Sequence, residues 1–327
     1  MLERLRQPWS DRRAERVLGA LSSLVLLTIA AMVVFVFAKA WPSLTGNGLA
    51  WFGGGGGVDQ QLTDIFNSPA DSSKWDYTFH AWPLIWATIL TTGISVIFAL
   101  IFSLFAAVFI VEFAPPSVRR IVEPVVRLLA AVPSVIYGLI GILVLVPFVR
   151  DTFISDQMRF DVAGVMQLNG AGLLVSVVIL TVMITPIMIA INVDALTSVP
   201  RGWREGAVAL GVNRWRAMWT VTIHASRPAI VAGAVLATAR ALGEAIMLAM
   251  VSGSVGFAPN PADGLTFIFE PLRTLAATIV DNAEGLSVKP FGQTIYAIAA
   301  VLLVSSFFLS FAGWAAKQPM KKYGVRI

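Results

Sequence analysis

The chain contains no cysteine, only two histidines and few charged residues. Without cysteine it can form no disulfide bond, no thiolate metal site and no cysteine nucleophile. Its histidines, His80 and His224, are too few and too scattered for a haem-carrying bundle. Charged residues make up 13% and hydrophobic residues 57% of the 327 positions, and the mean hydropathy is +0.78. This balance excludes a soluble domain and indicates an all-α, polytopic membrane protein.

Motifs that bind nucleotides or metals are also absent. The sequence has no Gly-x-x-x-x-Gly-Lys phosphate loop and no His-Glu-x-x-His zinc motif. The glycine run 53–57 is not followed by lysine or serine at phosphate-loop spacing, and no helical pattern begins there. We therefore expect a flexible linker at this run, no cofactor or metal, and no enzymatic activity of the chain's own.

Six apolar segments are long enough to cross a bilayer as helices. A hydrocarbon core of about 30 Å requires roughly 20 mostly apolar residues, because each helical residue advances about 1.5 Å. The six segments are Val17–Trp41, Pro83–Val111, Val122–Val149, Leu168–Val193, Pro228–Ser252 and Phe291–Ala316. The sequence therefore predicts about six transmembrane helices.

Basic residues gather on one side of these segments. They are Arg4, Arg6, Arg12, Arg13, Arg16, Arg119, Arg120, Arg127, Arg201, Arg204, Arg214, Arg216, Arg227, Lys317, Lys321, Lys322 and Arg326. Cytoplasmic loops carry such an excess, so both termini are expected in the cytoplasm and the protein in the cell (plasma) membrane. The net charge of +5 therefore reflects topology and does not indicate binding to nucleic acid.

The longer loops fall on the opposite side of the bilayer and set the expected division of the chain. Residues 1–82 should hold the N-terminal tail, the first span and the glycine-rich loop. Residues 83–317 should form the main transmembrane domain, with a cytoplasmic coupling loop at about 198–226, and 318–327 the cytoplasmic tail. Ala38-Lys39-Ala40 resembles a signal-peptidase site. The apolar stretch before it exceeds that of a signal peptide, so an uncleaved anchor is expected; cleavage would leave five spans.

The connection before the fifth span carries two helix signals separated by a glycine. Ser198 and Pro200 are typical of a helix start, because serine caps free N–H groups and proline fits the first turn. Gly211 permits a tight reversal, and Asn213 can cap a second short helix. We expect a compact helix-turn-helix able to enter a groove on a partner.

The second of these helices should end near Ile223 and carries Trp215, Met218 and Trp219 on one face. Tryptophans flanked by arginines suit a helix that rests among lipid headgroups. Amphipathicity alone therefore leaves a lipid anchor and a protein-docking helix equally open. The glycine bend favours docking, because a membrane anchor needs no bend.

Arg240 and Glu244 lie inside the apolar run of the fifth span. A charge at that depth costs at least about 2.5–3.5 kcal/mol, so both side chains should face protein or water. In a helix they would share one face, and mutual neutralisation is one interpretation. The other is an anion path, in which the planar fork of Arg240 contacts an oxyanion such as phosphate and Glu244 weakens that contact so the ion can leave.

Other residues in or near spans suggest structural roles. Glu123 and Arg127 are four apart near the cytoplasmic mouth, which predicts a structural ion pair. Pro133, Gly138 and Gly141 lower the helical propensity of the third span. Close helix packing is the stronger expectation for them, with a hinge or pore lining as the alternative. The span-end charges expected to be solvated are Glu112 and Asp194.

The segment from Glu205 to Ile230 resembles the EAA loop of ABC importer permeases. That pattern has Glu-Ala-Ala, a glycine four residues after the second alanine, then an apolar residue and Leu-Pro. The matching positions here are Glu205, Ala207, Gly211, Val221 and Ile223. The departures are Gly206, which loosens the helix, and His224, which softens the bend after Ile223 because it stands where proline is usual. The resemblance implies that an ATPase docks on a surface made of Glu205, Gly206, Ala207, Gly211, Trp215, Met218 and Trp219.

Two further stretches, Ala131–Gly141 and Ala239–Ala245, resemble phosphate-importer permeases. The second is closer to the PstC type than to the homologous PstA type, and the resemblance extends roughly from Pro83 to the C-terminus. It implies a type I, MetI-like permease that forms half of a path for inorganic phosphate. It also implies a PstA-like permease, a PstB-like ATPase dimer that hydrolyses the ATP, and a PstS-like extracytoplasmic phosphate-binding protein as partners.

Two alternative functions remain open at this level. One is a permease for sulfate, molybdate or phosphonate, because the docking segment is shared among importers. The other is an anion channel or carrier without a motor, which would require the helix after Gly211 to be only a lipid anchor. A membrane enzyme is a distant third, since no acid–base or metal set is present.

Overall fold

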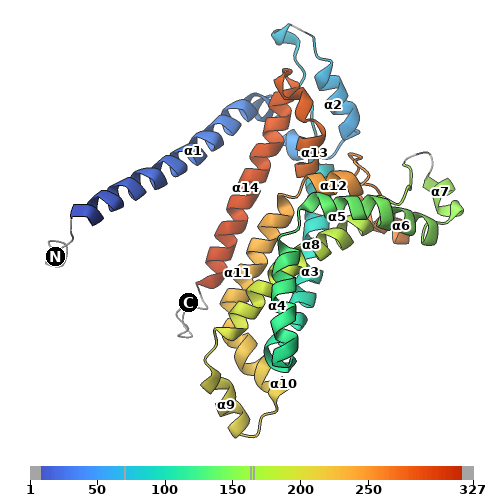
Figure 1. Cartoon of the computed structure of the whole chain (residues 1–327). Helices are drawn as coiled ribbons and strands as arrows, with labels where there is room; N and C mark the ends of the chain where they lie inside the picture. Colours follow the sequence, from blue (N-terminus) through green and yellow to red (C-terminus); the bar gives the residue numbers. More distant parts are fainter. Residues whose placement is uncertain (1–8, 70, 163, 165, 319–327) are drawn as a thin grey trace.

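The computed structural model describes residues 9–69, 71–162, 164 and 166–318, which fold almost entirely into helices (Figure 1). Within this part of the chain six helices are long and apolar enough to cross a membrane. The all-α, six-span class expected from composition is therefore confirmed. Five of the basic residues used for orientation lie outside the described residues: Arg4, Arg6, Lys321, Lys322 and Arg326.

Four long helices pack side by side at the centre of the bundle (Figure 1): α3 (Trp82–Val108), α8 (Leu173–Thr197), α11 (Ile223–Leu242) and α14 (Phe291–Lys317). Small polar side chains connect α3 to α8. Ser95 Oγ donates to the carbonyl oxygen of Val177 at 3.2 Å, and Asn192 Nδ2 donates to Ser103 Oγ at 3.0 Å. Small residues let helices approach closely in a membrane, and their polar atoms need partners there because water is absent.

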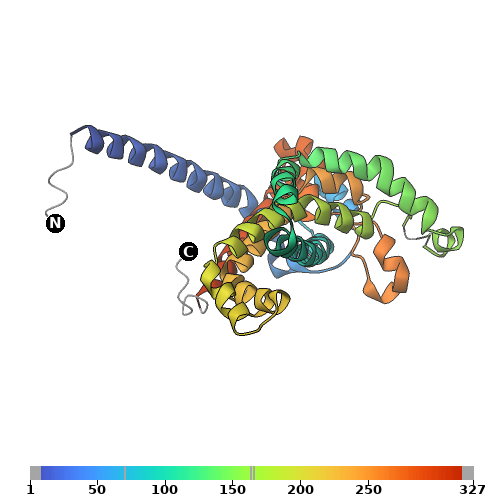
Figure 2. The same ribbon diagram turned by 60° about the horizontal axis from the view of Figure 1, so that its bottom comes forward.

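Helix α1 (Trp9–Asn47) diverges from the bundle and contacts α14 through its second half (Figures 1 and 2). Ser43 Oγ lies 3.2 Å from Thr294 Oγ1 in this contact. The Ala-Lys-Ala motif lies inside the continuous helix, and its last residue, Ala40, is buried. Residues 13–32 are exposed along their whole length. Such an apolar surface requires cover by lipid or by another protein.

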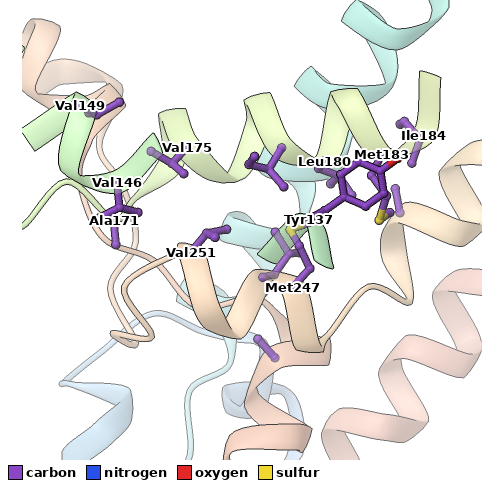
Figure 3. Close-up of a cluster of buried hydrophobic side chains, with 14 of the residues drawn as sticks. Tyr137, Val146, Val149, Ala171, Val175, Leu180, Met183, Ile184, Met247 and Val251 are labelled. Atoms are coloured by element: carbon purple, nitrogen blue, oxygen red, sulfur yellow. The ribbon is translucent and has the colours of Figure 1, made fainter. Parts of the chain in front are cut away.

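The largest buried cluster forms where α5 (Ser134–Ile140) meets α8 and α12 (Ile246–Val251). Figure 3 shows its side chains, among them Tyr137 from α5, Met183 from α8 and Met247 from α12. Three elements far apart in sequence thus share one apolar core at this end of the bundle. The cluster fixes α12 against α5 and α8, next to the point where α11 ends.

Gly138 and Gly141 bring α5 and α12 together. A Cβ atom at Gly141 would lie 2.5 Å from Val251 Cγ1, and one at Gly138 would lie 2.8 Å from Met250 Sδ. Real side-chain carbons do not approach neighbours so closely, so only glycine fits both positions without a shift. The close packing expected of these glycines is present, between α5 and α12.

We expect Gly141→Val to lower the free energy of unfolding by about 1–3 kcal/mol, the usual cost of overpacking a core. The measurement is thermal unfolding of the detergent-solubilised chain. Gly206→Ala is the matched control, because a Cβ there meets nothing within 4 Å and alanine favours the helix by up to about 1 kcal/mol. Equal melting temperatures for Gly141→Val and the wild type would show that the α5–α12 contact is looser than described.

The third expected span, Val122–Val149, is interrupted at Pro133, so its prediction as one helix was wrong. The chain forms α4 (Pro116–Ala130), and Pro133 then occupies the N-cap position of α5. Proline lacks an N–H group and disfavours helical geometry in the preceding residue, which prevents a continuous helix. Helix α5 continues through a π-helical turn, η5 (Gly141–Leu145), into α6 (Val146–Thr152). In Figure 1, α4 runs along the bundle whereas α5 and α6 run across it.

The fifth expected span, Pro228–Ser252, starts earlier and ends sooner than predicted. Helix α10 (Arg214–Ala217) passes through a π-helical turn, η6 (Met218–Thr222), directly into α11. No separate second helix therefore ends near Ile223. Helix α11 ends at Leu242 because the next residue is Gly243, and glycine is the poorest helix former after proline. Residues 243–245 are not helical, and α12 begins after them.

A helix follows the glycine run 53–57 directly, which corrects the expectation of a flexible linker. Gly57 is the N-cap of α2 (Val58–Phe66). The Asp59 carboxylate accepts a hydrogen bond from the N–H of Gly256 at 3.0 Å and forms an ion pair with Arg273. The buried face of α2 consists of Val58, Leu62 and Ile65. Further short elements are η2 (Gly48–Phe52), η3 (Ser72–Lys74), α7 (Asp156–Val162), η7 (Pro261–Phe269), α13 (Leu275–Asp281) and η8 (Ala283–Ser287).

Glu270 is buried in the loop between α12 and α13. Its carboxylate accepts a hydrogen bond from the N–H of Asn260 at 3.0 Å. Burial nevertheless raises its pKa above the ordinary value of 4.5, because a buried carboxylate loses the hydration that favours its charged form.

A raised pKa means that the folded chain holds this proton more tightly than the unfolded chain. The stabilisation is complete below the ordinary pKa and is lost as the pH rises through the folded one. We expect the melting temperature of the wild type to fall, relative to Glu270→Gln, as the pH rises above 4.5. Parallel pH profiles for the two proteins would contradict this assignment.

Candidate coupling elbow and central arginine

The exposed end of the bundle carries an elbow, which we define as residues 201–217. It consists of α9 (Arg201–Ala209), a glycine turn and α10. Gly211 has a φ of +85°, a left-handed conformation that glycine adopts without strain. The N–H of Val212 donates to the carbonyl oxygen of Ala207 at 3.2 Å and closes the turn. The tight reversal expected at Gly211 is therefore confirmed.

Of the two side-chain caps expected in the elbow, the one from Asn213 is present and the one from Ser198 is not. Asn213 Oδ1 accepts a hydrogen bond from the N–H of Arg216 at 2.7 Å and caps α10, as predicted. Ser198 does not cap α9, because its Oγ donates to the carbonyl oxygen of Ala195 at 2.7 Å. Pro200 holds the N-cap position instead. Its fixed φ is compatible with a helix start, so the chain can turn there without a capping side chain.

Helix α9 lies at the far end of the bundle in Figure 1 and has no buried residue. Glu205 and Gly206 are exposed, and Ala207 is half-buried. Beside the helix is a hollow of about 500 Å³, lined by Glu112, Arg201, Arg204, Glu205, Val208, Ala209 and Arg214. The outer face of α9 is therefore free to contact another protein, and it is rich in charge.

The apolar stripe that runs from α10 into η6 packs toward the bundle. Met218 is completely buried, and Trp219 is half-buried with its ring 5.9 Å from that of Phe105. The Trp215 ring lies 6.2 Å from that of Phe113, and its side chain is 49% exposed. A lipid anchor would need this stripe on the outside. Met218 and Trp219 pack against the bundle behind the elbow, and their expected contact with an ATPase stays a prediction.

Arg240 is exposed near the end of α11, and its side chain makes no ion pair or hydrogen bond within the described residues. Glu244 does not share its helical face, because Glu244 lies in the break before α12. There the Glu244 carboxylate accepts a hydrogen bond from the N–H of Met247 at 3.3 Å. The expected geometry of one turn on one helix was therefore wrong, since the helix ends between the two residues.

The ion pair expected between Glu123 and Arg127 is also absent. Glu123 Oε1 instead lies 2.5 Å from Arg119 Nε, one turn earlier in α4. Arg127 lies 3.9 Å from Asp194, with both side chains largely exposed. Arg119 and Arg127 are both four residues from Glu123. Isolated helices favour the order with the acidic residue first by only a few tenths of a kcal/mol, so this preference does not decide which arginine pairs with Glu123.

A contact between the elbow and the π-helical turn η4 (Phe109–Phe113), which follows α3, was not predicted from the sequence. Glu112 was expected to be solvated, yet its Oε2 lies 3.1 Å from Arg204 Nη1 in α9. The side chains are 18% and 19% exposed, respectively. The only available signal was an acidic residue at the end of one span and a basic loop on the same side of the bilayer.

Comparison with known proteins places this geometry in a family. Residues 99–317 match the family described as binding-protein-dependent transport system inner membrane component. The chain is 32% identical over 311 residues to the probable ABC transporter permease protein YqgH of Bacillus subtilis, covering 93% of this chain and 92% of that protein. It is 35% identical over 238 residues to the phosphate transport system permease protein PstC 1 of Mycobacterium tuberculosis, covering 69% and 68% respectively.

A solved structure agrees in fold. A chain of the inward-facing MetNI methionine ABC transporter superposes with a TM-score of 0.55 at 18% identity, covering 73% of this chain and 96% of that chain. The similarity supports the MetI-like, type I permease architecture. With six apolar helices it also indicates a multi-pass inner membrane protein. The chain belongs to the binding-protein-dependent transport system inner membrane components, the permease subunits of ABC importers.

Proposed function

We propose that this chain is the permease subunit of an ATP-driven importer of inorganic phosphate. The single observation that carries the choice of phosphate is the set of relatives named as phosphate transport system permeases, with identities of 29–35%. Arg240 fits this choice chemically. Its guanidinium stays charged at all physiological pH values and can donate two parallel hydrogen bonds to a tetrahedral oxyanion.

Arg240 acts as a transient contact on the phosphate path. Its exposure on a membrane helix requires water or another protein beside it, because an arginine facing lipid is costly. A homologous, PstA-like permease would cover this surface and complete the path. The break at residues 243–245 supports the assignment, since non-helical backbone inside a membrane is tolerated where it is buried in protein or lines a water-filled cavity.

In this proposal Glu244 acts on the anion and is not the ion-pair partner of Arg240. It lies in the break itself and is half-buried. A carboxylate near the path repels the anion and lowers its residence time, which conduction requires. We therefore keep Glu244 as the residue that weakens phosphate binding, acting from the break instead of from the face of α11.

The elbow couples the permease to a separate, PstB-like ATPase dimer. Glu205, Gly206 and Gly211 are exposed, and α9 projects from the bundle end, which suits insertion into a groove on the motor. This end is then cytoplasmic, together with both termini, and the end with α2 faces outward to receive a PstS-like binding protein. Closure of the ATPase would move the elbow and rock the bundles so that the path opens outward.

Transport by reconstituted membranes tests the substrate. Proteoliposomes that contain the chain with its partner permease, ATPase and binding protein should take up labelled phosphate when ATP is supplied. A hundredfold excess of unlabelled phosphate should suppress uptake, whereas the same excess of sulfate or molybdate should not. Suppression by sulfate or molybdate alone would assign the importer to that oxyanion.

A further inference from the structure

The contact between Glu112 and Arg204 joins two parts of the molecule that the sequence keeps far apart. Glu112 lies in η4 (Phe109–Phe113), a π-helical turn that continues α3 to its end. Arg204 lies in the middle of α9, and their side chains meet at 3.1 Å with less than a fifth of each exposed. Salt screens a partly buried pair less than an exposed one, so the attraction between these two side chains is stronger than in an ion pair on an open surface.

Helix α9 has little else to hold it to α3. None of its residues is buried, and its chain connections lead to α8 on one side and to α10 and α11 on the other. Among the described ion pairs, the Glu112–Arg204 pair alone connects α9 with another helix. The pair therefore connects α9 directly to the end of α3, whereas the backbone connects α9 only to α8 and α10.

The end of α3 is itself shaped for this contact. The π-helical turn is closed by a hydrogen bond from the N–H of Ala114 to the carbonyl oxygen of Phe109 at 2.8 Å. From the same turn Phe113 contacts Trp215 of α10. One turn of η4 thus touches both arms of the elbow, one arm through charge and the other through an aromatic contact. Single π-helical turns of this kind are frequent at functional sites.

We infer that the Glu112–Arg204 pair is the link that transmits movement of α9 to α3 during the transport cycle. The inference rests on the proposed function, because it requires a motor that moves α9. In this inference both residues are positioning residues, which act through α9 and α3 and not by touching phosphate or ATP. Without the pair, α9 could be displaced while α3 lags behind, so ATP would be hydrolysed with little transport.

Charge reversal separates this role from simple docking. The variants are Glu112→Arg, Arg204→Glu and the double exchange, each reconstituted with the partner permease, ATPase and binding protein. The measured quantity is the number of phosphate ions imported per ATP hydrolysed. We expect each single variant to co-purify with the ATPase and to lose at least about tenfold in this ratio, and the double exchange to recover at least about half of it.

The matched control is the exposed pair Arg127 and Asp194, whose side chains are 68% and 70% exposed. Arg127→Glu should leave the ratio unchanged, because exposed pairs contribute little. Wild-type ratios in both single variants, or a double exchange no better than the single ones, would overturn the inference. Failure of the proposed function would differ, since the wild type itself would then show no hydrolysis stimulated by the loaded binding protein.

Discussion

Replacing Arg240 with alanine should reduce phosphate uptake by about 100-fold while the permease still assembles. The substitution removes charge-assisted hydrogen bonds to phosphate, which are worth about 1.5–3 kcal/mol, or about 10- to 100-fold each. Assembly should not suffer, because removing a charge from a membrane helix lowers its insertion cost by about 2.5–3.5 kcal/mol. Arg240 also has no internal partner within the described residues that the substitution would leave unpaired.

Two further variants refine this expectation. Arg227→Ala removes the same charge from an exposed position in the first half of the same helix and should leave uptake near the wild-type rate. Arg240→Lys should fall between the wild type and Arg240→Ala, since lysine keeps the charge but lacks the planar fork. Labelled phosphate uptake with quantified permease in the membrane is the measurement. Wild-type uptake by Arg240→Ala would show that Arg240 does not contact phosphate on the path and has a structural role instead.

Replacing Glu205 with arginine should abolish stimulation of the ATPase by the loaded binding protein. Glu205 is exposed on α9 and forms no ion pair within the described part of the chain, so the variant breaks no internal contact. Losing one partner of a charge pair buried at an interface costs about 2–5 kcal/mol, which is enough to prevent docking. Stimulated hydrolysis and co-purification of the ATPase should therefore be lost together.

Glu15→Arg is the control, because it makes the same charge change at an exposed position in α1, far from the elbow. It should keep wild-type hydrolysis. If Glu205→Arg also kept stimulated hydrolysis and bound the ATPase normally, the outer face of α9 would not be the docking surface. The turn η6 after the elbow could not readily replace it, since Met218 is buried and Trp219 half-buried against the bundle.

Features governed by local chemistry could be predicted from the sequence. Long apolar runs predicted six spans because the bilayer requires about 20 such residues for each. Gly211 and Asn213 predicted the elbow, because a left-handed turn and a helix cap depend mainly on the residue that occupies them. The close approach at Gly138 and Gly141 followed in the same way, although the identity of the neighbouring helix did not.

Features governed by tertiary contacts or by helix ends were predicted less well. Pro133 and Gly243 each end a helix inside an apolar run, and hydropathy alone does not register such a break. The second break separates Glu244 from the face of Arg240. Local spacing could not choose between the two arginines available to Glu123, and the pairing of Glu112 with Arg204 spans 92 residues, beyond any local rule.

Stimulated ATP hydrolysis tests the claim that this chain couples phosphate import to a separate motor. The chain would be reconstituted in proteoliposomes with its partner permease, ATPase and binding protein, and hydrolysis measured with the binding protein empty or loaded with phosphate. The proposed function predicts that hydrolysis rises several-fold only with the loaded protein and in step with phosphate uptake. Phosphate flux that persists without the ATPase would contradict it and identify a channel or carrier instead.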